Sequence, residues 1–179
     1  MTLAYVFWHW SDGSAPAYAE RLGTFHRALA AHPPRGFRSS RSFAVAGAQW
    51  LPRGGGFEDW YLIDDFAALG ALNEAAVSGP RRDPHDRVAA LASGGAGGVY
   101  ALKAGEPGDV ATAWWFGKPR GTAYEVFFAR LLPLTREPGA ALWQRQMVLG
   151  PAPEFCLRSP RVAAPPSELQ ALAVACKPV

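Results

Sequence analysis

The sequence is poor in the residues that mark covalent cross-links and charged binding surfaces. Only two of its 179 residues are cysteines, Cys156 and Cys176. Two cysteines do not make a disulfide framework, and we expect both to be small, buried hydrophobic side chains. Charged residues make up 18% of the chain, and the net charge is +3. Lysine and arginine are scattered, with one short cluster at Arg81, Arg82 and Arg87, so no nucleic-acid partner is expected.

Long apolar runs are also missing. No apolar stretch approaches the ~20 residues that are needed to span a bilayer. The first apolar segment, residues 3–8, has no basic region ahead of it as a secretory signal would have. We therefore expect no membrane partner and a cytoplasmic location. Apolar residues still make up 49% of the sequence, which is enough for a globular domain with a sizeable core.

The common signatures of catalysis and cofactor binding are absent as well. The nucleophile motif Gly-x-Ser-x-Gly does not occur. The glycine-rich run 94–98 leads into an expected strand, whereas phosphate-binding loops follow a strand and open a helix, so we interpret the run as a flexible turn. His26 and His32 are six residues apart and so point to different helical faces. The acidic and histidine residues of segment 83–86 lie in a polar loop, and no metal site is predicted.

The apolar pattern of the first half predicts strands and helices in a definite order. Residues 3–10 are apolar on both alternating faces, as in a central strand covered on both sides. Apolar residues then recur at the spacing of one helical face, at Tyr18, Leu22, Phe25 and Leu29, and this pattern predicts a helix. The remaining elements are expected as strands at 37–46 and 57–63, which pair antiparallel, a helix at 66–77 capped by Asp64 or Asp65, a helix at 84–92, and a strand at 99–103.

The second half repeats this order in a shorter form. Strands are expected at 111–116, 141–149 and 154–159, with a helix at 124–132, and the last segment, 169–174, is either helix or strand. Three landmarks align between the halves. Trp8 and Trp114 lie 106 residues apart, as do Tyr18 and Tyr124, and the Val-x-Gly ends of two strands, 45–47 and 148–150, lie 103 apart. The pattern indicates a duplicated unit of domain size.

A βαββαβ unit is the ferredoxin-like arrangement, in which an antiparallel sheet carries both helices on one face. Its other face must be buried, and two fused copies bury those faces against each other. In element order and aromatic first strands the chain resembles the dimeric α+β barrel superfamily, in the fused, two-repeat form. The resemblance implies an α+β fold of two ferredoxin-like βαββαβ repeats, residues 1–105 and the shorter 106–179, with antiparallel sheets packed together, as a monomer or homodimer.

The same resemblance implies a small-molecule pocket, either between sheet and helices or inside the barrel. The superfamily includes cofactor-independent oxygenases of aromatic compounds, polyketide cyclases, isomerases, haem enzymes and proteins without known activity, so the fold does not select a reaction. The fused haem-binding members carry their proximal histidine in the second repeat. The second half of this sequence has no histidine, and we expect neither haem nor any other cofactor.

His9 is the leading candidate for catalysis. It lies in the first strand between Trp8 and Trp10 and shares a face with Tyr5 and Phe7. A histidine among aromatic side chains in a pocket is suited to act as a general base. The alternative is a core histidine that is hydrogen-bonded to a neighbour.

Arg41 is the second candidate, since it shares a strand face with apolar residues and would need an anionic partner there. That partner is either an oxygen atom of a substrate or one of the carboxylates Glu58, Asp59 and Asp64. Gln144, on the corresponding strand of the second half, is a further group that could orient a ligand or instead face solvent.

Aromatic walls suit a flat, apolar ligand, although core packing explains the same residues. The expected substrate-binding residues are Trp8, Trp10, Trp60, Tyr61, Trp115 and Gln144. The leading hypothesis is an enzyme without metal or nucleotide that acts on an apolar or aromatic metabolite as an oxygenase, cyclase or isomerase. The alternative is a non-catalytic ligand-binding or stress-type barrel.

Overall fold

Strands that are apolar on both faces must be buried on both sides. In this chain one face of the strands is buried in the interior of a barrel, and helices cover the other face. The computed structural model describes residues 1–147, 149–161 and 164–179. Within them, eight strands close into a barrel in the order β1-β3-β2-β8-β5-β7-β6-β4, and neighbouring strands in it pair antiparallel.

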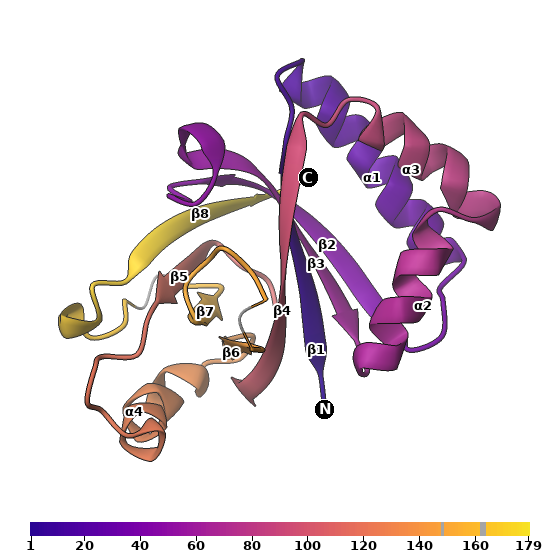
Figure 1. Ribbon diagram of the computed structural model, residues 1–179. Helices are drawn as coiled ribbons and strands as arrows, with labels where there is room; N and C mark the ends of the chain where they lie inside the picture. The colour runs from indigo at the N-terminus through magenta and orange to yellow at the C-terminus, as the bar shows by residue number, and fades with distance from the viewer. Residues whose placement is uncertain (148, 162–163) are drawn as a thin grey trace.

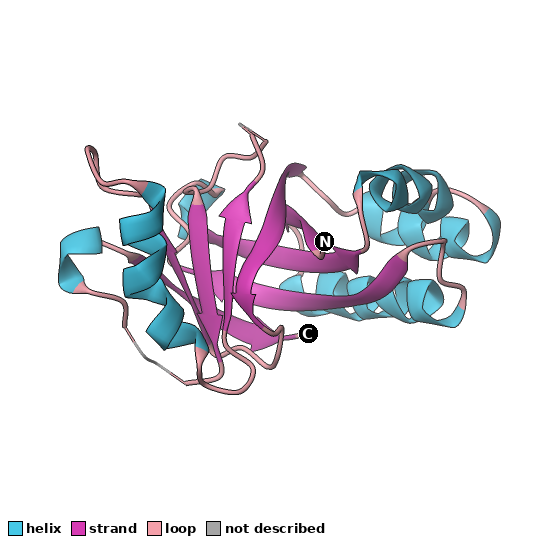
Figure 2. Cartoon of the chain, turned by 90° about the horizontal axis from the view of Figure 1, so that it is seen from below, coloured by secondary structure: helices cyan, strands magenta, loops and turns pink. Residues whose placement is uncertain are grey.

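In chain order the elements are β1 (Leu3–Trp10), α1 (Ala15–Ala31), β2 (Phe37–Ala46), β3 (Gly55–Ile63), α2 (Phe66–Ala76), α3 (Arg82–Ala89), β4 (Gly94–Gly105), β5 (Thr112–Phe116), α4 (Tyr124–Leu131), β6 (Ala141–Arg145), β7 (Phe155–Ser159) and β8 (Leu172–Pro178). Helices α1, α2 and α3 lie together outside β1 to β4, while α4 lies with the second-half strands at the other end of the molecule (Figures 1 and 2). No helix in these residues has the length and apolarity to cross a membrane.

The strands of each half are neighbours within the barrel. In the first half β1 pairs with β3 and β4, and β3 pairs with β2. In the second half β5 pairs with β7 and β8, and β7 pairs with β6. Pairings β2–β8 and β4–β6 join the two sets and close the barrel.

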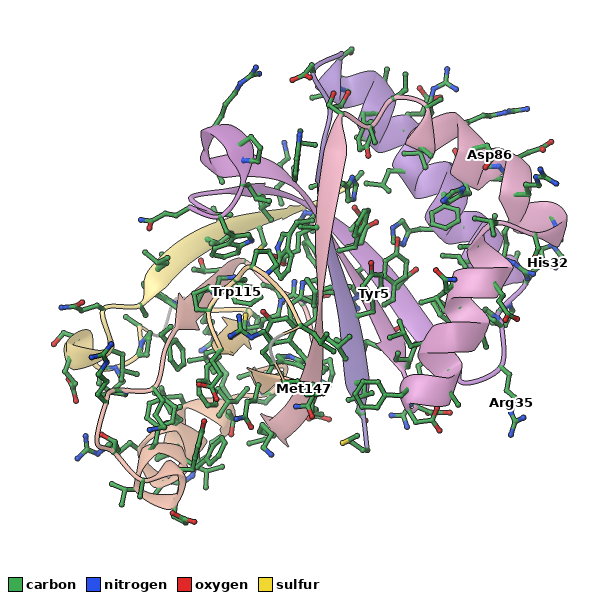
Figure 3. The ribbon with its side chains drawn as sticks, viewed as in Figure 1. Tyr5, His32, Arg35, Asp86, Trp115 and Met147 are labelled. Atoms are coloured by element: carbon green, nitrogen blue, oxygen red, sulfur yellow. The ribbon has the colours of Figure 1, made fainter. Side chains whose placement is uncertain are left out.

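Alternation along β1 separates the barrel interior from the helix-covered face. Ala4, Val6 and Trp8 point into the barrel and pack against Trp60 and Trp115. The odd-numbered residues of β1 face α1, α2 and α3. Figure 3 shows the two sides, with Tyr5 toward the helices and Trp115 within the barrel. A third cluster of buried side chains lies under α4.

The prediction of a flexible turn at 94–98 was wrong, because these residues form the first part of β4. They pair with β1, and the aromatic side chains of β1 lie across them. A Cβ atom at Gly95 would overlap the ring of Phe7, and one at Gly97 would lie 2.7 Å from the hydroxyl oxygen of Tyr5. The glycines are therefore present to admit aromatic rings rather than to supply flexibility.

The remaining expectations differ mostly at their ends. Asp65 caps α2, since its side chain accepts a hydrogen bond from the backbone N–H of Ala68 at 2.8 Å. Strand β6 stops at Arg145 rather than at 149, and the landmark at 148–150 includes Val148, which lies outside the described residues. The final segment is strand β8, held between β2 and β5.

Candidate functional site

A cavity of about 690 Å³ lies between the outer face of the first-half strands and the three helices that cover it. Strands β1 and β3 form its floor, and α1, α2 and α3 form its walls. Its lining is mostly apolar, and the polar side chains of His9 and Asp59 lie on the floor. Cavities of this size and composition are typical of sites for small organic ligands.

The floor is a row of stacked rings from β1. The Tyr5 and Phe7 centroids lie 6.1 Å apart, the Phe7 and His9 centroids lie 5.3 Å apart, and the planes within each pair are within 23° of parallel. Tyr61 of β3 continues the row beside Tyr5 at 6.0 Å. The glycines of β4 allow these rings to lie flat, so the floor matches the shape of a flat ligand.

The walls add aliphatic and aromatic side chains from the helices. Leu22 and Phe25 come from α1, Leu69 and Leu72 from α2, and Val88 from α3. Phe66, at the first turn of α2, also lines the cavity and is 47% exposed. The helices also contribute two polar side chains to the lining, Asn73 from α2 and His85 from α3.

His9 connects the cavity to a buried polar network. Its Nδ1 atom lies 2.6 Å from the hydroxyl oxygen of Tyr18 on α1, and its Nε2 atom lies 3.2 Å from Oδ2 of Asp59 on β3. The His9 residue is only 2% exposed. The contact with Asp59 is at ion-pair distance without the alignment of a hydrogen bond.

Asp59 is the centre of this network. The same Oδ2 atom accepts a hydrogen bond from the Tyr61 hydroxyl at 2.7 Å and lies 3.3 Å from Nε2 of His26. Burial by itself raises the pKa of the Asp59 carboxyl, but the imidazoles of His26 and His9 more than offset it and hold the pKa well below its usual range. Asp59 is therefore ionised at neutral pH.

An ionised Asp59 determines which nitrogen atoms of His9 carry protons. A carboxylate only accepts hydrogen bonds, so the nitrogen that faces it is Nε2–H. In neutral His9, Nδ1 is then the bare nitrogen, and the Tyr18 hydroxyl donates to it. Tyr18 remains a neutral donor, because burial and the Asp59 charge both raise its pKa above the usual value. The three contacting side chains of Tyr18, His9 and Asp59 can together accept a proton from a molecule in the cavity.

The predicted site residues are divided by the barrel wall. His9 and Tyr61 line the cavity. Trp8, Trp60 and Trp115 are buried inside the barrel, and the half-buried Trp10 packs against that interior core. These four indoles thus do not line the cavity around His9.

Arg41 and Gln144 also lie away from His9. Arg41 is at the surface, 54% exposed, and its Nη1 atom lies 2.5 Å from Oδ1 of Asp109. Gln144 of β6 donates to Glu154 at 2.9 Å in the second half. His9 and Arg41 do not line a common cavity among those described.

The prediction that Glu58, Asp59 or Asp64 pairs with Arg41 was wrong, because each of these carboxylates contacts other residues. Asp64 pairs with Arg38 at 2.5 Å. Glu58 lies inside the barrel and accepts hydrogen bonds from the indole N–H groups of Trp8 and Trp60, at 2.7 and 2.6 Å. Asp59 faces the histidines. The three carboxylates leave β3 and its following loop in different directions, so sequence proximity did not predict their partners.

Sequence reasoning did not select Tyr18, His26 or Asp59 as functional residues. The spacing along α1 places Tyr18 in an apolar stripe, and that pattern gives no indication of a role for its hydroxyl. The usable signal was Asp59, since a carboxylate that alternates with Phe57 and Tyr61 on one strand face is costly to bury without partners. Tertiary contacts bring these residues to His9 from two other elements.

The second half does not fit a haem. Residues 106–179 contain no histidine. The space between α4 and its strands is filled by buried side chains, namely Phe116, Phe127, Leu131, Leu142, Phe155 and Leu157. The described residues also contain no group of three or more His, Cys, Asp or Glu side chains placed to hold a metal ion.

Solved structures share this fold at low sequence identity. A protein described as a chlorite dismutase has a TM-score of 0.56 at 12% identity, over 99% of this chain and 94% of its own. An anthrone oxidase-like protein has a TM-score of 0.55 at 12% identity, over 99% and 91%. A protein described as a monooxygenase from Lactobacillus acidophilus NCFM has a TM-score of 0.55 at 9% identity, over 88% and 75%. No model of a protein family and no curated protein sequence matches the chain.

Proposed function

We propose that this protein is an enzyme that removes a proton from a flat, apolar small molecule bound between the first-half sheet and its helices. The chain has the fold of the dimeric α+β barrel proteins. The observation that carries the proposal is the contact of the Tyr18, His9 and Asp59 side chains at the floor of a mostly apolar cavity. An acid–base group in such a cavity is a candidate for catalysis on geometric and electrostatic grounds.

The three residues have distinct roles in the proposed step. The Tyr18 hydroxyl passes its proton to Nδ1 of His9 while it takes a proton from the substrate. His9 becomes an imidazolium, and the Asp59 carboxylate stabilises the new charge at 3.2 Å. Asp59 also fixes the orientation of the ring. A flat ligand bound against the apolar walls would displace water from the floor, which would strengthen these electrostatic interactions.

We propose oxidation by dioxygen as the reaction, with cyclisation and isomerisation as the other reactions that begin with such a step. Structural neighbours described as a monooxygenase and as anthrone oxidase-like support this choice. For anthrone, loss of the ring C–H proton gives an anion that dioxygen oxidises. The balanced reaction is anthrone plus dioxygen to anthraquinone plus water, in which His9 holds the proton between the two steps and no metal or organic cofactor takes part.

Anthrone is also the probe for the test. Dioxygen uptake and anthraquinone absorbance would be followed with the wild type, with His9→Gln and with Tyr18→Phe. Removal of a general base typically costs about 10²–10⁴-fold, and we expect losses in this range for His9→Gln. His32→Gln, at the exposed end of α1, is the matched control and should retain the wild-type rate.

A carrier protein would behave differently in the same experiment. Wild-type protein that binds anthraquinone but does not accelerate anthrone oxidation would favour the non-catalytic reading. Equal rates for the wild type and His9→Gln would contradict the assignment of His9 as the base.

We also propose that the barrel consists of two ferredoxin-like repeats, residues 1–105 and 106–179. The support is the common strand order of the halves, β4-β1-β3-β2 and β8-β5-β7-β6. In the second repeat one helix, α4, follows the first strand, and a short turn of 3₁₀-helix at Ser167–Leu169 stands where the second helix would be.

A further inference from the structure

Asp59 is shared by two imidazoles that line different compartments. His9 lines the cavity, whereas His26 lines a separate groove of about 510 Å³ between α1 and β2. Both Nε2 atoms approach the same Oδ2 atom, at 3.2 and 3.3 Å. The side chain of Asp59 is 2% exposed and that of His26 is 11% exposed. Asp59 therefore lies between the cavity and the groove.

One buried carboxylate is best neutralised by one cation. With both imidazoles neutral, the Asp59 charge would be buried without a counter-charge. With both protonated, the site would carry a net positive charge in a low-dielectric environment. Each of these states costs desolvation energy that the singly protonated state avoids. The two histidines are thus a coupled pair whose protonation states depend on each other.

The outer nitrogen of each ring faces a hydroxyl group. Nδ1 of His26 lies 2.7 Å from Oγ of Ser40, and Nδ1 of His9 lies 2.6 Å from the Tyr18 hydroxyl oxygen. A hydroxyl both donates and accepts, so it can bond to Nδ1 whether or not that atom carries a proton. Both Nε2–H groups meanwhile continue to face Asp59.

We propose that His26 is a proton outlet that acts through Asp59. His26 is the more exposed of the two rings, 11% against 2%, so a charge on it costs less desolvation; at rest it is the imidazolium, and His9 is neutral and able to act as a base. When His9 gains a proton at Nδ1 from the cavity side, His26 releases its Nδ1 proton through Ser40 to water in the groove. One proton enters and one leaves, so the charge around Asp59 stays constant, and when His9 returns its proton to the reacting molecule His26 takes one up again from the groove. The inference rests on the proposed function, and His26, which does not line the cavity, acts on the chemistry only through Asp59.

The other charged groups near His26 do not replace Asp59. In the groove, Arg41 is paired with Asp109 at 2.5 Å, and Arg27 lies on α1 beside His26. Tyr61 stacks on the His26 ring with centroids 5.3 Å apart and an interplanar angle of 10°. Burial and the Asp59 charge raise the pKa of Tyr61 well above its usual value, so it stays neutral.

The test is a pH titration of the ring nitrogens by NMR, in protein labelled with ¹⁵N-histidine and without any ligand. In His26→Gln the amide can still contact Asp59 and Ser40 but carries no charge. His9 then becomes the single cation for Asp59. We expect the midpoint of the His9 titration to rise by about one to three pH units, the usual effect of an opposite charge, and the rising limb of anthrone oxidation against pH to move the same way.

Controls make the result of the His9 titration independent of the result of the anthrone assay. His32→Gln should leave the His9 titration unchanged, and His26→Asn is a second uncharged variant if His26→Gln does not fold. Equal His9 midpoints in the wild type and in a folded His26 variant would overturn the proton outlet, whatever the anthrone assay gives. A shifted midpoint in a protein that does not oxidise anthrone would support the shared charge and contradict the oxidation alone.

Discussion

At the scale of single residues, Glu58 and Asp59 are neighbours on β3 whose side chains enter opposite environments. Glu58 points into the barrel, where burial raises its pKa more than Arg158 and the two indole N–H groups lower it. Asp59 points to the helix side, where two imidazoles hold its pKa below the usual range. Strand alternation alone therefore assigns one carboxylate to the core and the other to the candidate site.

Glu58→Gln should destabilise the protein although it is nearly isosteric. Each carboxyl oxygen accepts an indole N–H, from Trp8 or Trp60. An amide offers one oxygen and one NH₂ group, so one indole donor would be left unpaired in the core. We expect a loss of about 1–3 kcal/mol in urea unfolding, with the exposed Glu74→Gln as a control that changes little. Unchanged stability would contradict this account of the barrel interior.

Asp59→Asn should destabilise the protein in a way that depends on pH. Asp59 ionises near pH ~3.9 in the unfolded chain and at lower pH in the folded one. Its ionised form therefore stabilises the fold above pH ~4, and this contribution is lost as the pH falls through the folded pKa. We expect a loss of about 3–5 kcal/mol at pH 7, which stays constant down to pH ~4 and shrinks below it by about 1.4 kcal/mol per pH unit. A loss of unfolding free energy in Asp59→Asn that does not change with pH would contradict this role of the Asp59 charge.

At the scale of elements, β4 shows how packing overrides local propensity. Glycine is unfavourable in strands, so the glycine-rich run reads as a turn when taken alone. Strand β1 determines the outcome, because its rings need the space above β4. The end of the chain behaves similarly. Segment 172–178 becomes a strand because β2 and β5 offer it two edges to pair with.

Gly95→Ala tests this explanation of β4. The new Cβ atom would overlap the Phe7 ring and tilt it toward the cavity. We expect a loss of about 1–3 kcal/mol, as for an overpacked core, and weaker binding of anthraquinone. Gly117→Ala, whose Cβ would meet no atom within 4 Å, is the matched control. Both should be measured by urea unfolding, and equal stability of the two variants would argue against the ring-packing role.

The elements that the sequence predicted well are those with strong internal periodicity. The stripe from Tyr18 to Leu29 is buried along α1 as expected, and β2 pairs antiparallel with β3. The site was only partly predictable. His9 was identified from its own strand, but its partners reach it from α1 and β3 across the fold. No local pattern in those segments encodes the distance between them.

At the scale of the whole molecule, the two halves share a strand order but differ in how their outer faces are used. In the first half three helices cover β1 to β4 and leave a cavity with polar groups on its floor. In the second half α4 packs directly on Phe116 and Phe155. The candidate site therefore lies within residues 1–105, which contain all four histidines.

The most direct test of this account is a crystal structure of the wild-type protein with anthraquinone bound. We predict the ligand between the first-half sheet and α1 to α3, flat against Tyr5 and Phe7, with one of its two carbonyl carbons next to the Tyr18 hydroxyl. Anthraquinone bound under α4 or in the groove beside His26, with the first-half cavity empty, would contradict the central claim.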